Sequence, residues 1–194
     1  MQQYLSSSKY IDFDHPQVAA QAAELKSLYP DELELTKACF EFVRDEIKHS
    51  WDFKQNPLTC KASEALIHKT GFCFAKSHLL AALLRANDIP AGLCYQRLSV
   101  SGSGAPYCLH GLNAVYLSEF GWYQIDPRGN NPNVNAQFCP PIPQLAFPIN
   151  ETNEKTFAEI WPEPLSLITD ALEKEPDIES FYNNLPDIDI LTHT

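Results

Sequence analysis

Residues 71–86 read Gly71-Phe72-Cys73-Phe74-Ala75-Lys76-Ser77-His78-Leu79-Leu80-Ala81-Ala82-Leu83-Leu84-Arg85-Ala86. The leucines of this stretch recur at spacings of three and four, which predicts a mostly buried helix. Cys73 stands where that helix begins, and Gly71 permits a tight turn just before it. Unpaired backbone N–H groups and the positive end of the helix dipole both favour a thiolate there. The stretch therefore predicts a nucleophilic sulfur presented at a helix start.

A cysteine by itself does not establish this chemistry. Free cysteine is among the most buried residue types, so the alternative interpretation of Cys73 is a small core residue. The chain has no CxxC pair, no HExxH motif and no carboxylate-rich calcium loop, and we expect neither a structural metal nor a cofactor. The other five cysteines are scattered in apolar helix and strand patterns, unlike a disulfide scaffold: Cys39, Cys60, Cys94, Cys108 and Cys139.

Length and charge limit the class of protein. The chain has 194 residues, of which 44% are hydrophobic, and this predicts a single domain over 1–194. A net charge of -11 argues against nucleic acid and anionic membranes as partners. The N-terminal residues 1–9 have no basic region followed by an apolar run, and no window has the length of a membrane span. We expect a cytoplasmic protein; the oligomeric state is left unassigned.

The region ahead of Cys73 is predicted to be helical. Asp14-His15-Pro16 has the capping side chain and early proline of a helix start, and Asp31 can cap the next helix. Apolar residues then continue at helical spacing as far as Ile47. The predicted elements are a helix from 16 to 28, a helix of about four turns from 32 to 47, an ordered loop over 48–61, and a short helix over 64–68 capped by Ser63.

Beyond Pro90 the apolar pattern changes to a period of two. Three strands are predicted, over 91–100, 107–117 and 121–125, with a tight turn at 118–120. Helices followed by antiparallel strands are typical of the α+β class. Residues 127–148 are rich in proline with interleaved aromatic residues, which predicts a segment wrapped on the domain. A last helix over 164–173 and an acidic tail over 176–194 complete the chain.

His110 and Asp126 are the residues that favour a catalytic interpretation of Cys73. If the turn after the second strand has an odd number of residues, Asp126 shares a face with His110 on the neighbouring strand. Diagonal neighbours on a sheet lie about 7–8 Å apart at Cα, close enough for an imidazole–carboxylate hydrogen bond. Taken alone, His110 is equally a satisfied core histidine and Asp126 a turn-capping residue.

Together the three residues have the logic of a catalytic triad. His110 would take the thiol proton and later protonate a leaving amine, while Asp126 would orient the ring. The Cys73 N–H is one oxyanion donor, and the loop around Trp51, Asp52 and Lys61 is a candidate for the second. The remaining histidines are not favoured as the base: His78 and His68 lie well round their helices, and His15, His49 and His193 have no evident carboxylate.

Several blocks of this chain resemble the core of bacterial transglutaminase-like proteins. The blocks are Thr59-Cys60-Lys61-Ala62-Ser63-Glu64-Ala65-Leu66, Gly71-Phe72-Cys73-Phe74-Ala75-Lys76-Ser77, Leu83-Leu84-Arg85-Ala86-Asn87-Asp88-Ile89-Pro90-Ala91, His110-Gly111-Leu112-Asn113-Ala114-Val115-Tyr116 and Gly121-Trp122-Tyr123-Gln124-Ile125-Asp126-Pro127-Arg128-Gly129-Asn130. The resemblance covers about residues 35–131. It implies a papain-like α+β fold, with the nucleophile helix packed on an antiparallel sheet and a Cys73-His110-Asp126 triad.

The resemblance also suggests residues that contact substrate. Lys76, Asn113 and Arg128 lie within the family's motifs, and Trp51 and Asp52 lie in the preceding loop. Each also has a structural interpretation: Asn113 is on the opposite strand face from His110, and Arg128 can anchor the loop after Asp126. We expect these five residues to border the substrate site.

The expected activity is that of a cysteine enzyme that forms a thioester at Cys73. Hydrolysis of an amide or peptide bond, as in a cysteine protease, is the first hypothesis. Acyl transfer to an amine shares its first half, and a binding module that retains the triad behind a closed cleft is the third hypothesis. The calcium sites and β-sandwich domains of many eukaryotic transglutaminases are not visible in the sequence, so the resemblance does not establish protein cross-linking.

Overall fold

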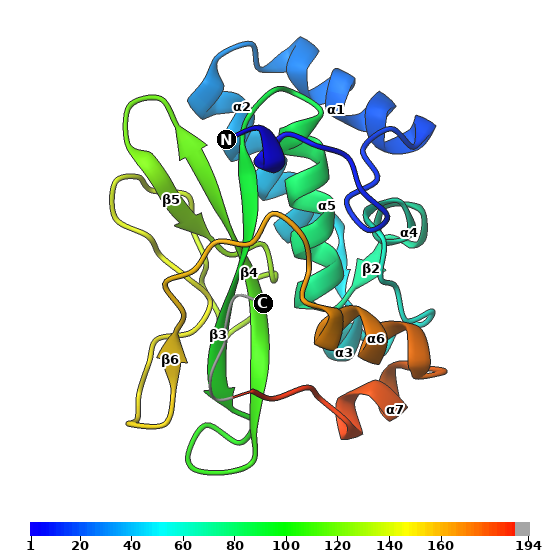
Figure 1. Cartoon of the computed structure of the whole chain (residues 1–194), viewed down its shortest axis with the longest axis vertical. Helices are drawn as coiled ribbons and strands as arrows, with labels where there is room; N and C mark the ends of the chain where they lie inside the picture. The colour runs from blue at the N-terminus through cyan, green and yellow to red at the C-terminus, as the bar shows by residue number, and fades with distance from the viewer. Residues whose placement is uncertain (189–194) are drawn as a thin grey trace.

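The computed structural model describes residues 1–188, and its centre is a four-stranded antiparallel sheet (Figure 1). The strand order is β5-β4-β3-β6. Three strands follow the predicted ranges closely, whereas the short fourth strand was not predicted. Their bounds are β3 Ala91–Ser99, β4 Tyr107–Leu117, β5 Gly121–Ile125 and β6 Lys155–Thr156.

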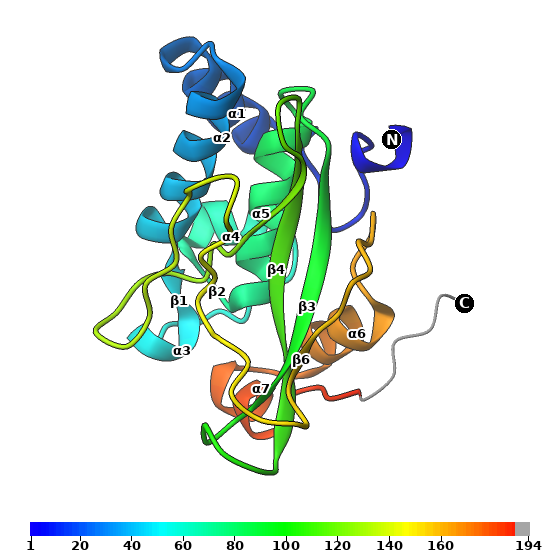
Figure 2. The ribbon, with the colours of Figure 1, turned by 90° about the vertical axis from the view of Figure 1, so that its left-hand side faces the viewer.

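Helix α5 (Cys73–Arg85) lies along β4 and β3 and forms the centre of the core (Figure 2). Every residue of α5 is buried, because helices cover the faces that the sheet leaves open. Leu79, Leu80, Leu83 and Leu84 have no exposed surface at all. The sequence prediction of a mostly buried helix is therefore confirmed.

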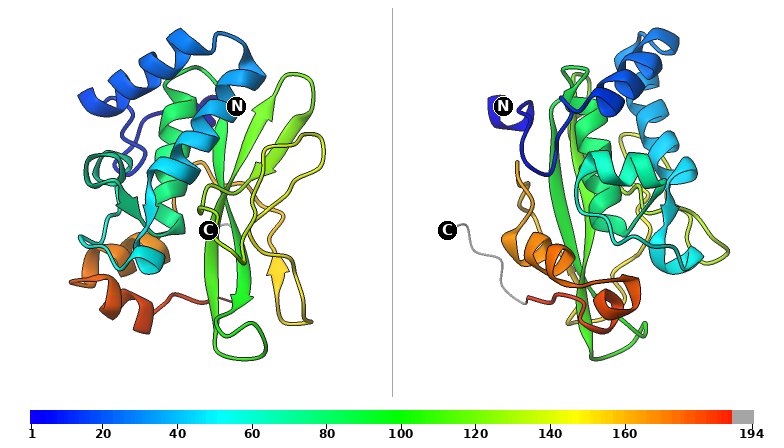
Figure 3. Two further views of the ribbon diagram at one scale, coloured as in Figure 1. Left: turned by 180° about the vertical axis from the view of Figure 1, so that it is seen from behind. Right: turned by 90° about the vertical axis from the view of Figure 1, so that its right-hand side faces the viewer.

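The first two helices also begin where the sequence predicts. His15 accepts a hydrogen bond from the Gln17 N–H at the start of α1 (Pro16–Leu28), and Asp31 caps α2 (Glu32–Glu41). The chain then continues as a π-helical turn, Phe42–Glu46, instead of the regular helix expected up to Ile47. A short 3-10 helix, Gln2–Tyr4, precedes them, and α1 and α2 lie beside α5 at one end of the molecule (Figure 3).

Residues 48–61 contain regular structure that the sequence prediction missed. Strand β1 (Lys48–His49) pairs in parallel with β2 (Thr70–Gly71), and α3 (Ser50–Phe53) follows it directly. In this register His49 lies opposite Gly71, two residues before Cys73. The pairing therefore fixes the segment predicted as an ordered loop beside the start of α5.

The short helix before α5 is capped differently from the prediction. Helix α4 spans Ala62–His68, and the Glu64 carboxylate accepts hydrogen bonds from the N–H groups of Cys60 and Lys61. Ser63, the predicted cap, instead uses its hydroxyl to bind Asp12. The cap therefore comes from inside the helix, and Ser63 joins the helix to the N-terminal segment.

The C-terminal part of the chain is more ordered than its acidic composition suggests. Helix α6 (Ser166–Lys174) occupies the predicted position, and α7 (Ile178–Asn183) lies within the predicted tail. Phe181 of α7 is fully buried against Phe72 and Phe74, which explains why the segment packs on the domain. Residues 189–194 of that predicted tail lie outside the described residues. Within 1–188, the helices are too short or too polar to traverse a lipid bilayer.

Candidate active site

Cys73 is the first residue of α5, and its sulfur faces a cavity. The cavity has a volume of about 430 Å³ and is bordered by residues from the start of α5, from β3 and β4, and from α7. The side chain of Cys73 is 7% exposed, so it is enclosed but reachable from that cavity. The first N–H groups of a helix have no partner in a preceding turn, and the Cys73 N–H is one of them. The geometry is that of a sulfur at a helix start beside an open pocket.

His110 and Asp126 are brought together by the register of β4 and β5. Ile125 pairs with Asn113, so Asp126 follows on the face of the sheet that His110 occupies. The His110 Nε2 and the Asp126 Oδ2 atoms are 2.8 Å apart. The three-residue turn after β4 gives the diagonal arrangement that the sequence predicts, and His110 lines the cavity with Cys73.

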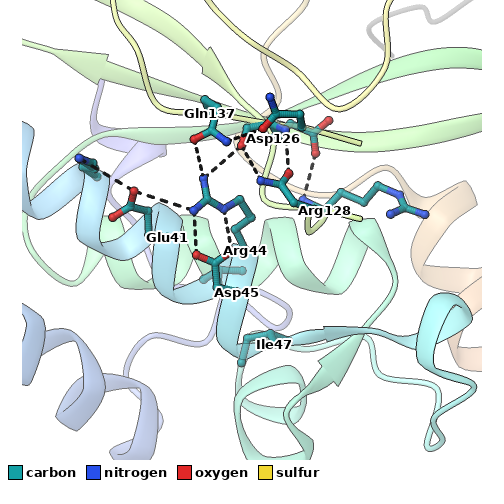
Figure 4. Close-up of polar contacts among 12 residues, drawn as sticks. Glu41, Arg44, Asp45, Ile47, Asp126, Arg128 and Gln137 are labelled. Atoms are coloured by element: carbon teal, nitrogen blue, oxygen red, sulfur yellow. Dashed lines mark hydrogen bonds and ion pairs between the residues drawn. The ribbon is translucent and has the colours of Figure 1, made fainter. Parts of the chain in front are cut away.

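The carboxylate of Asp126 is held by backbone groups from the segment that follows it. The N–H of Arg128 donates to Oδ1 at 3.1 Å, and the N–H of Ala146 donates to Oδ2 at 3.0 Å. Figure 4 shows the Arg128 contact and, beside it, Arg44 donating to the side chain of Gln137. The proline-rich segment 127–148 is therefore packed on the domain, as predicted, and it fixes this carboxylate.

The charges of the three residues support one another. Burial raises the pKa of Cys73, but the charge and hydrogen bond of His110, with a hydrogen bond from His49, bring it down to about 6. Burial lowers the pKa of His110, whereas the charges of Asp126 and Cys73 raise it to about 10. Burial raises the pKa of Asp126 and His110 lowers it, with a net lowering. A thiolate–imidazolium pair next to an ionised carboxylate is the favoured state near neutral pH.

Gly111 allows the strand to approach the helix this closely. Its N–H donates to the Cys73 sulfur at 3.4 Å. A Cβ atom at this position would lie 2.7 Å from the ring of Phe74 and 3.3 Å from its Cα. Only glycine fits between β4 and the first turn of α5, and the residue beside His110 thereby contributes a further hydrogen bond to the sulfur.

His49 is a residue of the site that the sequence prediction missed. It lines the same cavity as Cys73, and its presence beside the thiol contributes to the lowered pKa of Cys73. The expectation that His49 has no carboxylate is wrong, because its Nδ1 atom is 3.4 Å from Oδ1 of Asp52. The spacing of three residues between His49 and Asp52 on a short helix was the available signal.

Two of the predicted substrate residues, Trp51 and Arg128, border the cavity. Asp52 does not border the cavity, and its carboxylate binds the guanidinium of Arg128 at 2.8 and 2.9 Å. Burial raises the pKa of Asp52, but His49 and Arg128 lower it well below its usual range. Asp52 therefore connects His49 to Arg128, and Lys61 does not border the cavity.

The other two predicted substrate residues, Lys76 and Asn113, are fully buried away from the cavity. The Lys76 amine donates to the backbone oxygens of Val43, Arg44 and Ile47 at the π-helical turn. Burial lowers the pKa of Lys76 to about 7. The Asn113 amide donates to the backbone oxygen atoms of Ser77 and Gly92. Both side chains join backbone segments, and we do not include them in a substrate site.

Residues 1–188 contain no group of three or more His, Cys, Asp or Glu side chains arranged to hold a metal ion. All six cysteines are free thiols. Burial raises the pKa of Cys39, Cys60, Cys94 and Cys108 to about 12 in each case, in contrast to Cys73. Cys73 is therefore distinguished from these four cysteines by the imidazole groups beside it.

Comparison with solved structures gives several proteins to which this chain is similar. A candidate cysteine protease from Cytophaga hutchinsonii is 19% identical, with a TM-score of 0.52, over 64% of this chain and 40% of that chain. The periplasmic domain of TgpA from Pseudomonas aeruginosa is 21% identical, with a TM-score of 0.48, over 64% and 45%. Red sea bream transglutaminase is 14% identical, with a TM-score of 0.40, over 59% and 25%. The chain thus matches less than half the length of each.

The comparison of families gives a match over more than half of the chain. The model of the transglutaminase-like superfamily matches residues 19–127, a range that includes Cys73, His110 and Asp126. No curated protein matches the chain. The helix-on-antiparallel-sheet architecture confirms the predicted α+β class and the papain-like, transglutaminase-type core. The chain belongs to the transglutaminase-like superfamily.

Proposed function

We propose that this protein is a cysteine enzyme that cleaves an amide or peptide bond through a thioester at Cys73, with His110 and Asp126 completing the triad. The observation that carries the proposal is the arrangement of a lowered-pKa cysteine and a buried His110–Asp126 pair at one cavity. A perturbed thiol in a cleft, beside an imidazole that a carboxylate orients, is suited to nucleophilic catalysis.

The first half of the reaction forms the acyl-enzyme. The Cys73 thiolate attacks the carbonyl carbon, and a carbon–sulfur bond forms as the carbonyl oxygen becomes an oxyanion. The Cys73 N–H and the His49 ring donate hydrogen bonds to that oxygen. The imidazolium of His110 then protonates the leaving nitrogen as the carbon–nitrogen bond breaks, and Asp126 keeps the ring oriented throughout.

The second half releases the acyl group. His110, now neutral, takes a proton from water, and the resulting hydroxide attacks the thioester carbon. The carbon–sulfur bond breaks, a carboxylic acid leaves, and the thiolate and imidazolium are restored. An open cavity of about 430 Å³ beside the sulfur supports an enzyme over a binding module with a closed cleft.

The test is labelling with a thiol-directed probe. Iodoacetamide and a peptidyl chloromethyl ketone are applied to wild type, Cys73→Ala and His110→Ala, and the labelled cysteines are mapped by mass spectrometry. We expect Cys73 to react fastest of the six cysteines in the wild type and much more slowly in His110→Ala. Equal reactivity of Cys73 in these two proteins would remove His110 from the proposed role.

The acceptor in the second half is tested separately. With a fluorogenic peptidyl amide as donor, added primary amines compete with water for the thioester. The hydrolysis hypothesis predicts that the acid remains the main product. Capture of the acyl group mainly by the amine would favour the amine-transfer hypothesis instead.

The cytoplasmic location predicted from the sequence remains a prediction.

A further inference from the structure

The part of the β4 edge that β5 does not cover lies next to the nucleophile and carries two backbone N–H groups. The backbone N–H groups of β4 point alternately toward β3 and toward the opposite edge of the strand. Strand β5 covers that opposite edge only as far as Asn113. Beyond that point the Gly111 N–H donates to the Cys73 sulfur, and the next N–H on the same edge belongs to Leu109. These two groups form a short strand edge that leads away from the sulfur.

The chain's own C-terminal segment occupies that edge. The N–H of Leu109 donates to the backbone oxygen of Pro186 at 2.8 Å, between segments separated by the whole of β5, β6, α6 and α7. Figure 1 shows the chain after α7 running to the lower end of β3 and β4. Residues 184–187, which we call the edge segment, thus lie against the edge of β4 where β5 stops.

The edge segment is anchored by an ion pair and follows a stacked aromatic pair. Asp187 accepts two hydrogen bonds from the guanidinium of Arg97, each at 2.7 Å, and its side chain remains 32% exposed. Just before the edge segment, the ring of Tyr182 in α7 stacks on Trp51 with centroids 3.5 Å apart. Tyr182 and Leu185 both border the cavity that contains Cys73.

The position of this contact suits the backbone of an extended peptide that reaches the sulfur. Alternate residues on a strand edge are about 6.6–7 Å apart, so the N–H of Leu109 lies about two residues along an extended peptide from the sulfur. A peptide whose carbonyl group reaches Cys73 would make its next backbone hydrogen bond with Leu109. Strand addition of this kind gives affinity through the backbone and selectivity through alternate side chains.

Building on the proposed function, we infer that the β4 edge at Leu109 is a subsite for an extended peptide with an acidic residue near Arg97, and that residues 184–187 occupy it as a tethered, substrate-like segment. The carboxylate of Asp187 marks where the acidic side chain of the substrate binds. Substrate and edge segment therefore compete for the same N–H and the same guanidinium.

The experiment weakens the tether in the full chain. Asp187→Ala removes the ion pair with Arg97, and Glu173→Ala removes the exposed ion pair with Lys9 as a matched control outside the cavity. A tripeptidyl chloromethyl ketone with an acidic residue reports on the subsite, and iodoacetamide reports on the sulfur alone. We expect Asp187→Ala to raise the peptidyl rate about threefold or more, with iodoacetamide changed less than twofold.

Two further measurements separate the subsite from a structural role. Hydrogen exchange at the Leu109 amide should accelerate in Asp187→Ala, while the Leu112 amide, which pairs with β3, keeps its protection. A synthetic peptide of residues 183–188 should slow the peptidyl probe on Asp187→Ala competitively, and the same peptide with lysine at position 187 should not.

An unchanged ratio of peptidyl to iodoacetamide rates in Asp187→Ala, or no competition by the synthetic peptide, would overturn the subsite. Cys73 would still react with iodoacetamide in that case, and the proposed function would stand. Loss of iodoacetamide labelling at Cys73 in the wild type itself would instead overturn the proposed function. The two failures are therefore distinguishable.

Discussion

The backbone N–H of Gly111 donates to the sulfur of Cys73 at 3.4 Å, and this contact joins the strand that carries His110 to the helix that carries the nucleophile. It depends on the absence of a side chain at position 111, where a Cβ atom would meet the ring of Phe74 at 2.7 Å. The distance between β4 and α5 therefore determines the distance between the Cys73 thiol and the His110 imidazole.

Gly111→Ala is expected to push β4 away from the start of α5. Overpacking of this kind costs about 1–3 kcal/mol of unfolding free energy, and alkylation of Cys73 should slow as His110 moves away. Thermal unfolding and alkylation kinetics measure both effects. The double variant Gly111→Ala/Phe74→Leu should recover part of each loss, and an absence of recovery would show that the Phe74 contact is not the cause.

The alkylation rate of Cys73 should depend on pH as an ion pair does. The pKa of Cys73 falls to about 6 and that of His110 rises to about 10, so the thiolate–imidazolium pair is present between these values. The rate should rise as the pH passes about 6 and then remain level. In His110→Ala the lowering influence of the imidazolium is lost, the pKa of Cys73 rises, and the rate at pH 7 should fall about a hundredfold. A profile that does not change in this variant would contradict the pairing.

His49 is expected to act on the oxyanion. With a fluorogenic peptidyl amide, His49→Ala should lower kcat by about tenfold to a hundredfold, since one oxyanion donor is lost. His49→Gln supplies a neutral amide donor and should restore part of kcat without restoring a titrating group. If glutamine restores nothing while the alkylation profile of Cys73 is unchanged, hydrogen-bond donation to the oxyanion is not the role of His49.

Lys76 should affect stability and leave the chemistry of the site unchanged. Lys76→Met leaves the backbone oxygens of Val43, Arg44 and Ile47 without their donor, which should cost about 1–3 kcal/mol of unfolding free energy. Denaturant unfolding measures this loss, and Lys37→Met, at an exposed lysine of α2, is the control. A selective rise in KM in Lys76→Met, with the free energy of unfolding unchanged, would show that Lys76 contributes to substrate binding.

Much of the fold follows from local patterns. The leucine spacing predicts α5, the change to a period of two at Pro90 predicts the strands, and the three-residue turn gives the register that joins His110 to Asp126. These features depend on residues close together in the sequence, or on one hairpin. Pattern and structure therefore agree for them.

The features that the sequence prediction missed depend on partners far along the chain. His49 faces the sulfur because β1 pairs with β2, and its neighbour Asp52 is bound by Arg128, which is far away in the sequence. The sequence of α7 predicts an acidic tail, whereas in the structure Phe181 packs against Phe72, which lies far away in the sequence. Lys76 is near Cys73 in the sequence, yet its side chain does not border the cavity. Helix α5 is buried on every side, so a residue close to Cys73 in the sequence can point into the protein interior.

The family match ends at residue 127, but the Ala146 N–H that holds Asp126 and the cavity residues Phe147, Tyr182 and Leu185 all lie beyond it. The three proposed triad residues thus lie within the family match, whereas part of the cavity wall comes from the stretch that follows it. Under the proposed function, exchange of that stretch is expected to change the cavity wall and to leave Cys73 and His110 in place. Grafting that stretch between relatives is accordingly a route to altered selectivity with an unaltered nucleophile.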